Sequence, residues 1–521
     1  MNNAVVLAAD LSLPNLDYKA LAPMLILFGA ASLGVLVEAF VRRGRNTIQF
    51  GLSLISLVAA LVAVVLMARS GRTVITAGTA VAVDRVTLFL EGTLIALGIV
   101  VLLLVAERAL EQGGPFVAQA AITVGSEADR RQATAEGSTE AFPLSLFALA
   151  GMMLFVSAND LLTMFVALEV FSLPLYLLCA LARRRRLLSQ EAALKYFLLG
   201  AFASAFFIFG MALLYGFTGS VRLADLHAAA VATNTGSTVL LYSGIALLSV
   251  ALLFKIAAVP FHVWTPDVYQ GAPTPVTALM SACTKVAAFG ALLRVLTVAI
   301  DWTQWNIEQV LAPIAILTML VGAILAVTQT DIKRLLAYSS IANAGYILVG
   351  VLAFDQEGVR SSLFYLAAYG FTVIAAFAVV TLVRDEDGEA THLSRWAGLG
   401  RRSPMVAGIF TFLMLAFAGI PLTSGFISKF AVFSAALGTR GPWQIAMVVA
   451  GVVTSIVLVF PYLRVVVLMY LSEPGENTPT VLVPGAFTSA ALMVGVLATL
   501  VLGVFPGPVL DLVNTAALFR R

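Results

Sequence analysis

Apolar segments recur along the whole chain and are separated by short polar stretches. A helix of about 20 apolar residues crosses the roughly 30 Å hydrocarbon core of a bilayer, so each segment is predicted to be a transmembrane helix. We therefore expect an all-α polytopic membrane protein with about 14 transmembrane helices. The predicted helices cover residues 21–41, 48–68, 86–106, 141–158, 160–181, 191–217, 238–261, 274–298, 308–328, 332–353, 360–383, 404–435, 442–470 and 482–506.

Two of the apolar segments contain helix breakers. The first is interrupted at Pro260, and in the second Gly419, Pro421 and Gly425 are interpreted as break residues. Proline removes a backbone donor, so the freed carbonyls of a broken membrane helix must bind protein groups or water instead of lipid.

The spacing of the two breaks predicts an internal repeat. They lie five predicted helices apart, which favours two five-helix repeats, at 141–298 and 308–470, each with a broken helix. A shift by an odd number of spans inverts the second repeat in the membrane, as in many transporters. Residues 1–140 would then supply three helices and a polar loop at 107–140, and residues 471–521 a last helix.

Composition supports the membrane assignment. Of 521 residues, 60% are hydrophobic and 11% are charged, against about 25% charged residues in a soluble domain. The net charge of +3 is small and scattered, which argues against a nucleic-acid partner. Cys179 and Cys283 lie in apolar helices without metal-ligand spacing. The sequence contains no phosphate loop and no Cys/His cluster for a redox centre, so we expect no cofactor in this chain.

Basic residues predict the orientation. Arginines cluster in alternate loops, most densely at Arg183–Arg186. The positive-inside rule places these loops in the cytoplasm and both termini on the outer side. The segment 107–140, rich in Gly, Ser, Ala and charge, is predicted to be a flexible cytoplasmic loop.

Lysines indicate the chemistry. Of the six lysines, Lys195, Lys255, Lys285 and Lys429 lie in strongly apolar segments, whereas Lys19 and Lys333 fall at helix ends or in loops. A charge within the bilayer costs roughly 2.5–3.5 kcal/mol even on lenient scales, so buried lysines need an explanation. A buried lysine can lose its proton where arginine stays charged, which predicts a protonatable path.

Glu169 and Lys195 are the first candidates along that path. Glu169 lies roughly 13–15 Å into its helix, near mid-membrane, and could instead bind a neighbouring helix for packing alone. Lys195 is a candidate partner for Glu169, although it could also extend to the cytoplasmic surface.

Lys255 is the strongest candidate because it precedes the break at Pro260 by one turn. His262 follows the break and could relay protons, or could be a hydrogen-bonded structural residue. Lys285 lies on the next helix, among small residues, and Lys429 follows the second break. Four further residues are weaker candidates: Glu38, Glu91, Arg294 and Arg464.

These segments resemble a known family. The carriers of the resemblance are FKIAAVPFHVWTPDVYQGAPTPVTALMSACTKVAAF (254–289), EAALKYFLLGAFASA (191–205), IKRLLAYSSIANAGY (332–346) and GIPLTSGFISKF (419–430). They are similar to the antiporter-like membrane subunits of respiratory complex I, and most resemble the subunit N branch of bacterial proton-translocating NADH:quinone oxidoreductase. The resemblance covers about 140–470 well and the termini loosely.

The resemblance implies roles for the candidates. Glu169 and Lys195 would form a glutamate–lysine pair, Lys255 would be the central lysine, Lys285 the connecting lysine and Lys429 the terminal lysine. The protein would be a multi-pass subunit in the bacterial plasma (inner) membrane, contacting lipid and other membrane-arm subunits. It would couple quinone reduction elsewhere in the complex to proton transfer, with NADH, FMN, iron–sulfur clusters and quinone in partner subunits, including the peripheral NADH-oxidising ones.

Three alternatives remain open at this stage. A subunit of a multisubunit cation/proton antiporter or of a related membrane-bound hydrogenase would share the fold and the lysines. A purely structural membrane-arm subunit would carry lysines that do not transfer protons.

Overall fold

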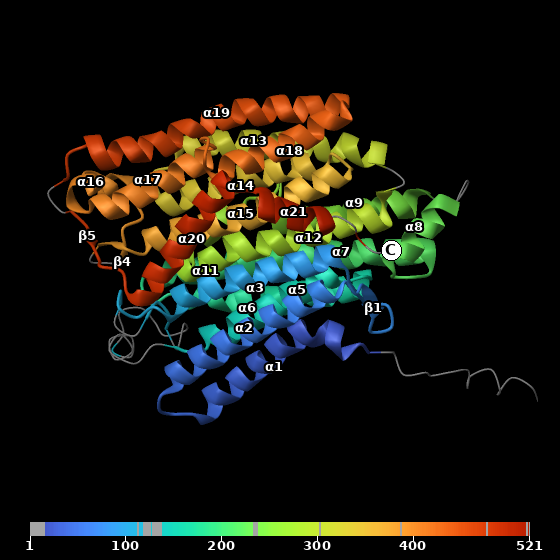
Figure 1. Ribbon diagram of the computed structural model, residues 1–521, viewed down its shortest axis with the longest axis horizontal. Coiled ribbons are helices and arrows are strands. Elements are labelled where there is room, and N and C mark those ends of the chain that lie inside the picture. Colours follow the sequence, from blue (N-terminus) through green and yellow to red (C-terminus); the bar gives the residue numbers. More distant parts are fainter. Residues whose placement is uncertain are drawn as a thin grey trace, which may run out of the picture.

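The computed structural model describes residues 16–111, 114–117, 127, 138–232, 238–301, 304–385, 388–475, 478–516 and 519. Its long helices lie side by side along one direction (Figure 1). The helices before the first break are α1 (Tyr18–Phe40), α2 (Arg45–Ser70), α3 (Arg85–Ala106), α5 (Ala141–Ser157), α6 (Leu161–Ala180), α7 (Arg186–Thr218), α8 (Leu223–Ala232) and α9 (Thr238–Ile256).

Between the two breaks the chain forms a second series of helices. In order they are α10 (Trp264–Gly271), α11 (Thr274–Leu279), the π-helical segment η2 (Met280–Thr284), α12 (Lys285–Arg294), the π-helical segment η3 (Val295–Ala299), α13 (Gln304–Thr328), α14 (Ile332–Val351), α15 (Gln356–Val380), the 3-10 helix η5 (Leu393–Trp396), α16 (Leu399–Arg402) and α17 (Pro404–Ala418). After the second break come α18 (Ser424–Thr439), α19 (Pro442–Leu471), α20 (Ala486–Val504) and α21 (Gly507–Ala516).

Short strands occur only near the ends of the described helices. Strands β1 (Val74–Thr76) and β2 (Val81–Val83) form an antiparallel hairpin between α2 and α3. At the opposite end of the bundle, β3 (Val383–Asp385) pairs with β4 (Gly388–Glu389) and with β5 (Thr480–Val481). The C-terminus lies at the end that holds β1 and α8 (Figure 1).

Every predicted transmembrane range contains a helix in the structure. Among the described residues, 11 helices are long and apolar enough to cross a membrane by length and composition. Helices α5, α14 and the two halves α17 and α18 are shorter or less apolar and fall outside that group. The all-α polytopic fold is thus confirmed, while the count of 14 crossings and the inverted repeats stay predictions.

Both predicted helix breaks are present. Helix α9 ends at Ile256 and α10 begins at Trp264, with Pro260 between them. Helix α17 ends at Ala418 and α18 begins at Ser424, so that Gly419 and Pro421 lie in the second break. Gly425 lies in the first turn of α18 and not in the break, which corrects its interpretation as a break residue. A side chain at Gly425 would collide with the backbone oxygen of Ala416, so this glycine lets α18 approach the end of α17.

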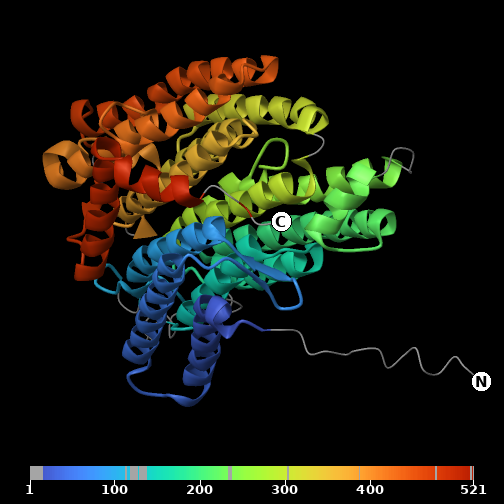
Figure 2. The ribbon, with the colours of Figure 1, turned by 45° about the vertical axis from the view of Figure 1, so that its right-hand side comes forward.

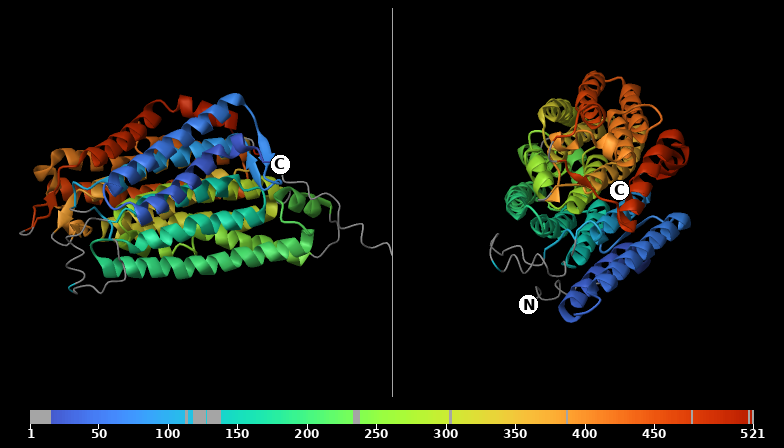
Figure 3. Two further views of the ribbon diagram at one scale, coloured as in Figure 1. Left: turned by 90° about the horizontal axis from the view of Figure 1, so that it is seen from below. Right: turned by 90° about the vertical axis from the view of Figure 1, so that its left-hand side faces the viewer.

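Two segments form the centre of the bundle. The α11–η3 segment is buried along its whole apolar window, and α15 is 94% buried over its window. Helices α1, α2, α7 and α19 instead leave wide apolar faces exposed on the outside of this chain. Seen nearly along the helices, α1 and α2 lie at one edge of the bundle (Figure 3), and Figure 2 shows the same pair from another side. Charges on the central segments are therefore shielded from lipid by the chain itself.

Much of the predicted 107–140 loop lies outside the described residues. Its described ends make specific contacts: Glu107 accepts a hydrogen bond from the backbone nitrogen of Thr488 at 3.0 Å, and Glu111 forms ion pairs with Arg184 and Arg384.

Candidate functional site

Lys255 lies in the last turn of α9, directly before the first break, and its side chain is buried. Its Nζ donates to Ser172 Oγ at 2.8 Å, from helix α6. The rings of Phe171 and Tyr176 lie 5.3 and 5.8 Å from the same nitrogen, close enough for cation–π attraction. The predicted position beside the break is thus occupied by an ammonium held by one hydroxyl and by aromatic faces.

Lys285 is the first residue of α12 and directly follows the π-helical segment η2. Its buried Nζ donates to Ser340 O at 2.7 Å and to Ile256 O at 3.4 Å. Ile256 is the last residue of α9, next to Lys255. The first break therefore brings the end of the Lys255 helix to the ammonium of Lys285.

Lys429 lies in α18 and is also buried. Its Nζ donates to Phe417 O at 3.0 Å and to Ala418 O at 3.1 Å, the last two carbonyls of α17. The ring of Tyr346 on α14 lies 5.0 Å from the same nitrogen. The C-terminus of a helix carries partial negative charge, so this ammonium is held by the dipole of α17.

Polar side chains of α14 and α15 lie beside Lys429. On α14, Asn343 donates to Ser339 O at 2.8 Å, and its Oδ1 accepts a hydrogen bond from Tyr365 of α15 at 2.6 Å. Asn343 and Tyr365 also line a cavity of about 10 Å³ beside Lys429, close to the volume that one water needs. Hydroxyl groups and water can pass protons along hydrogen bonds, so these side chains place a polar, water-sized space next to Lys429.

The predicted Glu169–Lys195 pair is wrong in this structure. Lys195 forms ion pairs with Asp267 at 2.6 Å and Glu191 at 2.7 Å, and its side chain is 40% exposed. Glu169 instead accepts a hydrogen bond from Ser204 Oγ at 2.5 Å. Glu169 lies one helical turn from Ser172, the partner of Lys255, so the glutamate belongs to the Lys255 site.

Further contacts are formed by residues at and next to the first break. His262 lies between α9 and α10, where its Nδ1 is buried and has no hydrogen-bond partner among the described residues. The backbone nitrogen of Val259 donates to Thr318 Oγ1 at 3.0 Å, and Trp264 Nε1 donates to Phe254 O at 3.1 Å. Protein groups thus satisfy backbone atoms that the first break frees.

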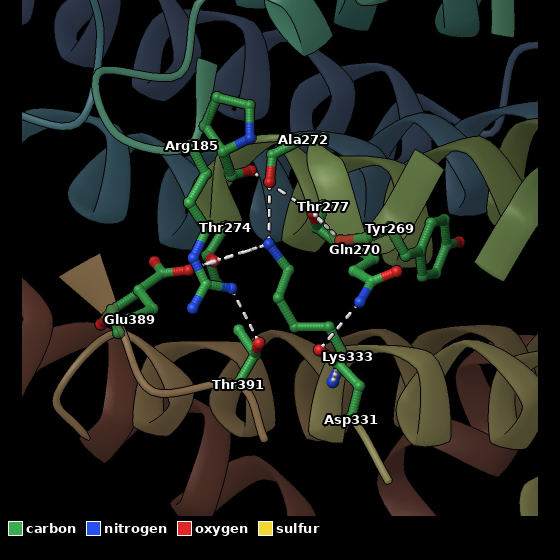
Figure 4. Close-up of polar contacts among 12 residues, drawn as sticks. Arg185, Tyr269, Gln270, Ala272, Thr274, Thr277, Asp331, Lys333, Glu389 and Thr391 are labelled. Atoms are coloured by element: carbon green, nitrogen blue, oxygen red, sulfur yellow. Dashed lines mark hydrogen bonds and ion pairs between the residues drawn. The ribbon is translucent and has the colours of Figure 1, made fainter. Parts of the chain in front are cut away.

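The sequence places Lys333 at a helix end, and the structure shows that its side chain is only 2% exposed. Figure 4 shows its Nζ directed at the chain between α10 and α11, where it donates to Ala272 O at 2.8 Å and to Thr274 Oγ1 at 3.1 Å. Glu389 of β4 lies 3.8 Å away as the counter-ion. Two hydrogen bonds and this ion pair make Lys333 a clamp between α14 and the chain that leads to Lys285.

The weaker candidates are mostly structural. Glu38 pairs with Arg45 at 3.0 Å, and Arg464 donates to Val327 O at 2.9 Å near the end of α13. Arg294 forms an ion pair with Asp84 at 2.9 Å that is almost completely buried.

No group of three or more His, Cys, Asp or Glu side chains that could hold a metal ion occurs in the described part of the chain. The amines, hydroxyls and carboxyl group described above are groups that can take up and release protons. Together, the broken helices and buried lysines define the class of antiporter-like, proton-translocating membrane subunits.

Comparisons with known proteins agree with this class. Residues 158–457 match the family described as NADH:quinone oxidoreductase/Mrp antiporter, TM, and the chain belongs to that family. The NADH-quinone oxidoreductase subunit N of Salinispora arenicola is 65% identical, over 98% of this chain and 100% of its own length. The subunit N of Saccharopolyspora erythraea is 58% identical, over 97% and 99%.

Solved structures show the same relationship. A chain of respiratory complex I from Thermus thermophilus is 34% identical with a TM-score of 0.75, covering 94% of this chain and 98% of that one. A chain of the Mrp complex from Dietzia is 25% identical with a TM-score of 0.81, covering 96% and 97%. The resemblance to subunit N is confirmed, and the chain is a proton-translocating membrane-arm subunit of the oxidoreductase.

Proposed function

We propose that Lys255, Lys285 and Lys429 are the proton-carrying groups of this subunit. One observation supports the proposal most directly: each ammonium is buried, and no described carboxylate lies within ion-pair distance of it. A buried charge without a counter-ion is costly, so a small change in its surroundings can load or unload the proton.

The contacts suggest an order of transfer. Glu169 and Ser172 adjoin Lys255, the end of α9 joins Lys255 to Lys285, and Asn343 and Tyr365 lead toward Lys429. In this scheme Glu169 changes the field at Lys255, and Lys195 remains at the surface as a partner of Asp267.

The setting is proposed from the family. The chain would lie in the bacterial plasma membrane with the Arg183–Arg186 loop in the cytoplasm and the β1–α8 end outside. It would assemble with the other subunits of complex I, which would carry FMN, the iron–sulfur clusters and the sites for NADH and quinone. This chain would carry no redox centre itself and would act in the enzyme through proton transfer alone.

The decisive experiment is Lys255→Ala in the assembled complex, reconstituted into vesicles. We expect normal assembly and a loss of at least about tenfold in NADH-driven proton uptake, equivalent to about 1.4 kcal/mol in the transfer barrier. Lys19→Ala is the matched control, because Lys19 is an exposed lysine at the start of α1. Normal pumping by an assembled Lys255→Ala complex would refute the proposal.

A cation/proton antiporter is the second candidate, because the Mrp chain shares the fold over nearly its whole length. Purification from native membranes separates the two. Flavin and iron–sulfur subunits with sodium-independent NADH:quinone activity support the first function. Antiporter partners with sodium-dependent proton exchange would support the second.

A further inference from the structure

A second buried charged cluster lies apart from the lysines, where α3 packs against α12. Asp84 caps the start of α3, accepting a hydrogen bond from Thr87 N at 2.9 Å. Arg294, the last residue of α12, donates to Asp84 Oδ2 at 2.9 Å, to Thr87 Oγ1 at 2.6 Å and to Val156 O at 3.0 Å. The arginine and its aspartate are thus fixed in place by several bonds.

Glu91 completes this cluster and has no such bonds. It lies two turns after Asp84 on α3, on the same face, and its side chain is completely buried. Neither carboxyl oxygen of Glu91 has a hydrogen-bond partner among the described residues, and the same holds for Nη1 of Arg294. The charges of Asp84 and Arg294 both act on the Glu91 carboxyl group.

The charges in the cluster do not balance if both acids are ionised. Arg294 supplies one positive charge and is already paired with Asp84, so an ionised Glu91 would be a buried charge without a bonded partner. Such a charge costs several kcal/mol, and a buried carboxyl group avoids that cost by keeping its proton. The unused Nη1 of Arg294 is the group that could donate a hydrogen bond to the Glu91 carboxylate once the proton has left.

One helix, α12, carries both Arg294 of this cluster and Lys285. Helix α12 runs from Lys285 to Arg294 and has a π-helical segment at each end, η2 before Lys285 and η3 after Arg294. Such segments often mark functional sites in helices. A movement of α12 would shift Lys285 against Ser340 O and Arg294 against Asp84 together.

We propose that Glu91 is an additional proton-binding site of this subunit, controlled by Arg294. While Asp84 holds Arg294, Glu91 is a neutral carboxylic acid. When α12 moves, the O–H bond of Glu91 breaks, the proton passes to water at the end of the bundle that holds β1 and β2, and Nη1 of Arg294 pairs with the carboxylate. A proton supplied by the proposed lysine path then re-forms the O–H bond, and Nη1 of Arg294 is released while Nη2 stays on Asp84.

The proposal is tested with Glu91→Gln in the whole complex in vesicles, measuring protons moved per NADH oxidised. Glutamine mimics the neutral acid, so we expect normal assembly with a clear fall in that ratio, and Glu91→Asp should restore most of it. Glu38→Gln is the control, because Glu38 is paired with Arg45. Redox-induced infrared difference spectra should show a carboxylic acid carbonyl band that disappears in Glu91→Gln only.

Each other outcome overturns the inference. An unchanged ratio without such a band shows that Glu91 is silent. Failure of Glu91→Gln to assemble, while Glu91→Asp assembles, shows that Glu91 is ionised at rest. The inference also rests on the proposed function, and the Lys255→Ala complex measured beside it separates the two. Loss of pumping in Lys255→Ala with a normal proton ratio in Glu91→Gln rejects this inference alone. Normal pumping in both variants also rejects the proposed roles of Lys255, Lys285 and Lys429.

Discussion

The two helix breaks differ in which lysine binds the backbone carbonyls that each break frees. In the second break, Lys429 lies after the interruption and donates to both final carbonyls of α17. In the first break, Lys255 lies before the interruption and its ammonium turns away to Ser172. The freed carbonyl of Ile256 is instead bound by Lys285, which comes from a different helix.

At the second break one lysine both holds a buried charge and binds the freed carbonyls, whereas at the first break different residues do so. Lys429 both carries charge and closes the end of its own broken helix. In the first half, Lys255 carries charge while Lys285 and Trp264 bind the carbonyls at the end of α9. A change in the protonation of Lys285 would therefore alter a hydrogen bond at the end of the helix that holds Lys255, whereas a change at Lys429 would alter hydrogen bonds within one broken helix.

The largest expected effect comes from Lys429→Met compared with Lys285→Met. Both should lower NADH-driven proton uptake at least about tenfold. Lys429→Met leaves two buried carbonyls without this donor, each costing about 1–3 kcal/mol, and should also lower the thermal stability of the subunit more. Lys285→Met also removes the donor of two carbonyls, but only that of Ile256 lies at a helix break, whereas Ser340 O lies inside α14.

Thermal unfolding of the purified complexes and pumping in vesicles check both points, with Lys19→Met as control. Equal stability loss in the two variants would show that the breaks are equivalent after all.

A smaller effect is expected for Tyr365→Phe, which removes a hydroxyl group beside Lys429 from the proposed proton path. The change removes the 2.6 Å hydrogen bond to Asn343 and nothing else in the ring. Loss of one buried hydrogen bond costs about 1 kcal/mol, so we expect proton uptake to fall severalfold while NADH oxidation with an uncoupler stays normal. Tyr338→Phe, at a half-buried tyrosine of α14, is the control. Unchanged uptake would mean that protons do not pass this bond.

The smallest effect is expected for Lys195→Ala. Its side chain is 40% exposed and its ion pairs with Asp267 and Glu191 lie near the end of the bundle. Exposed pairs contribute about 0–1 kcal/mol, so pumping and stability should remain within about twofold of the parent complex. A loss as large as that of Lys255→Ala would restore the predicted Glu169–Lys195 pair.

The sequence predicted the helices well because lipid imposes length and apolarity on each of them. It also predicted the burial of Lys255, Lys285 and Lys429, since a charge inside an apolar segment is visible without coordinates. The pairing of Glu169 failed because the partner depends on how α6 and α7 are rotated toward each other, which hydropathy does not encode.

Lys333 and Glu91 show a second limit of the sequence. The burial of Lys333 depends on Ala272, 61 residues earlier, and on Glu389 of a short strand. Glu91 lies among apolar residues, as the candidate lysines do, but its lack of a bonding partner depends on Arg294 of α12 being held by Asp84. Such long-range contacts can be found only in the folded chain.

The packing of α20 on α15 has a consequence for biosynthesis. Thr372 of α15 shares a 2.9 Å hydrogen bond with Thr499 of α20, and Gly495 brings the two helices so close that a side-chain carbon there would lie 2.7 Å from Ala375 Cβ. The ribosome makes α15 more than 100 residues before α20 is complete. During that interval the face of α15 that α20 will cover, including its threonine, must be tolerated by lipid or shielded by an insertion factor. The hydroxyl of Thr372 is therefore buried against protein only after α20 has inserted, and not when α15 itself inserts.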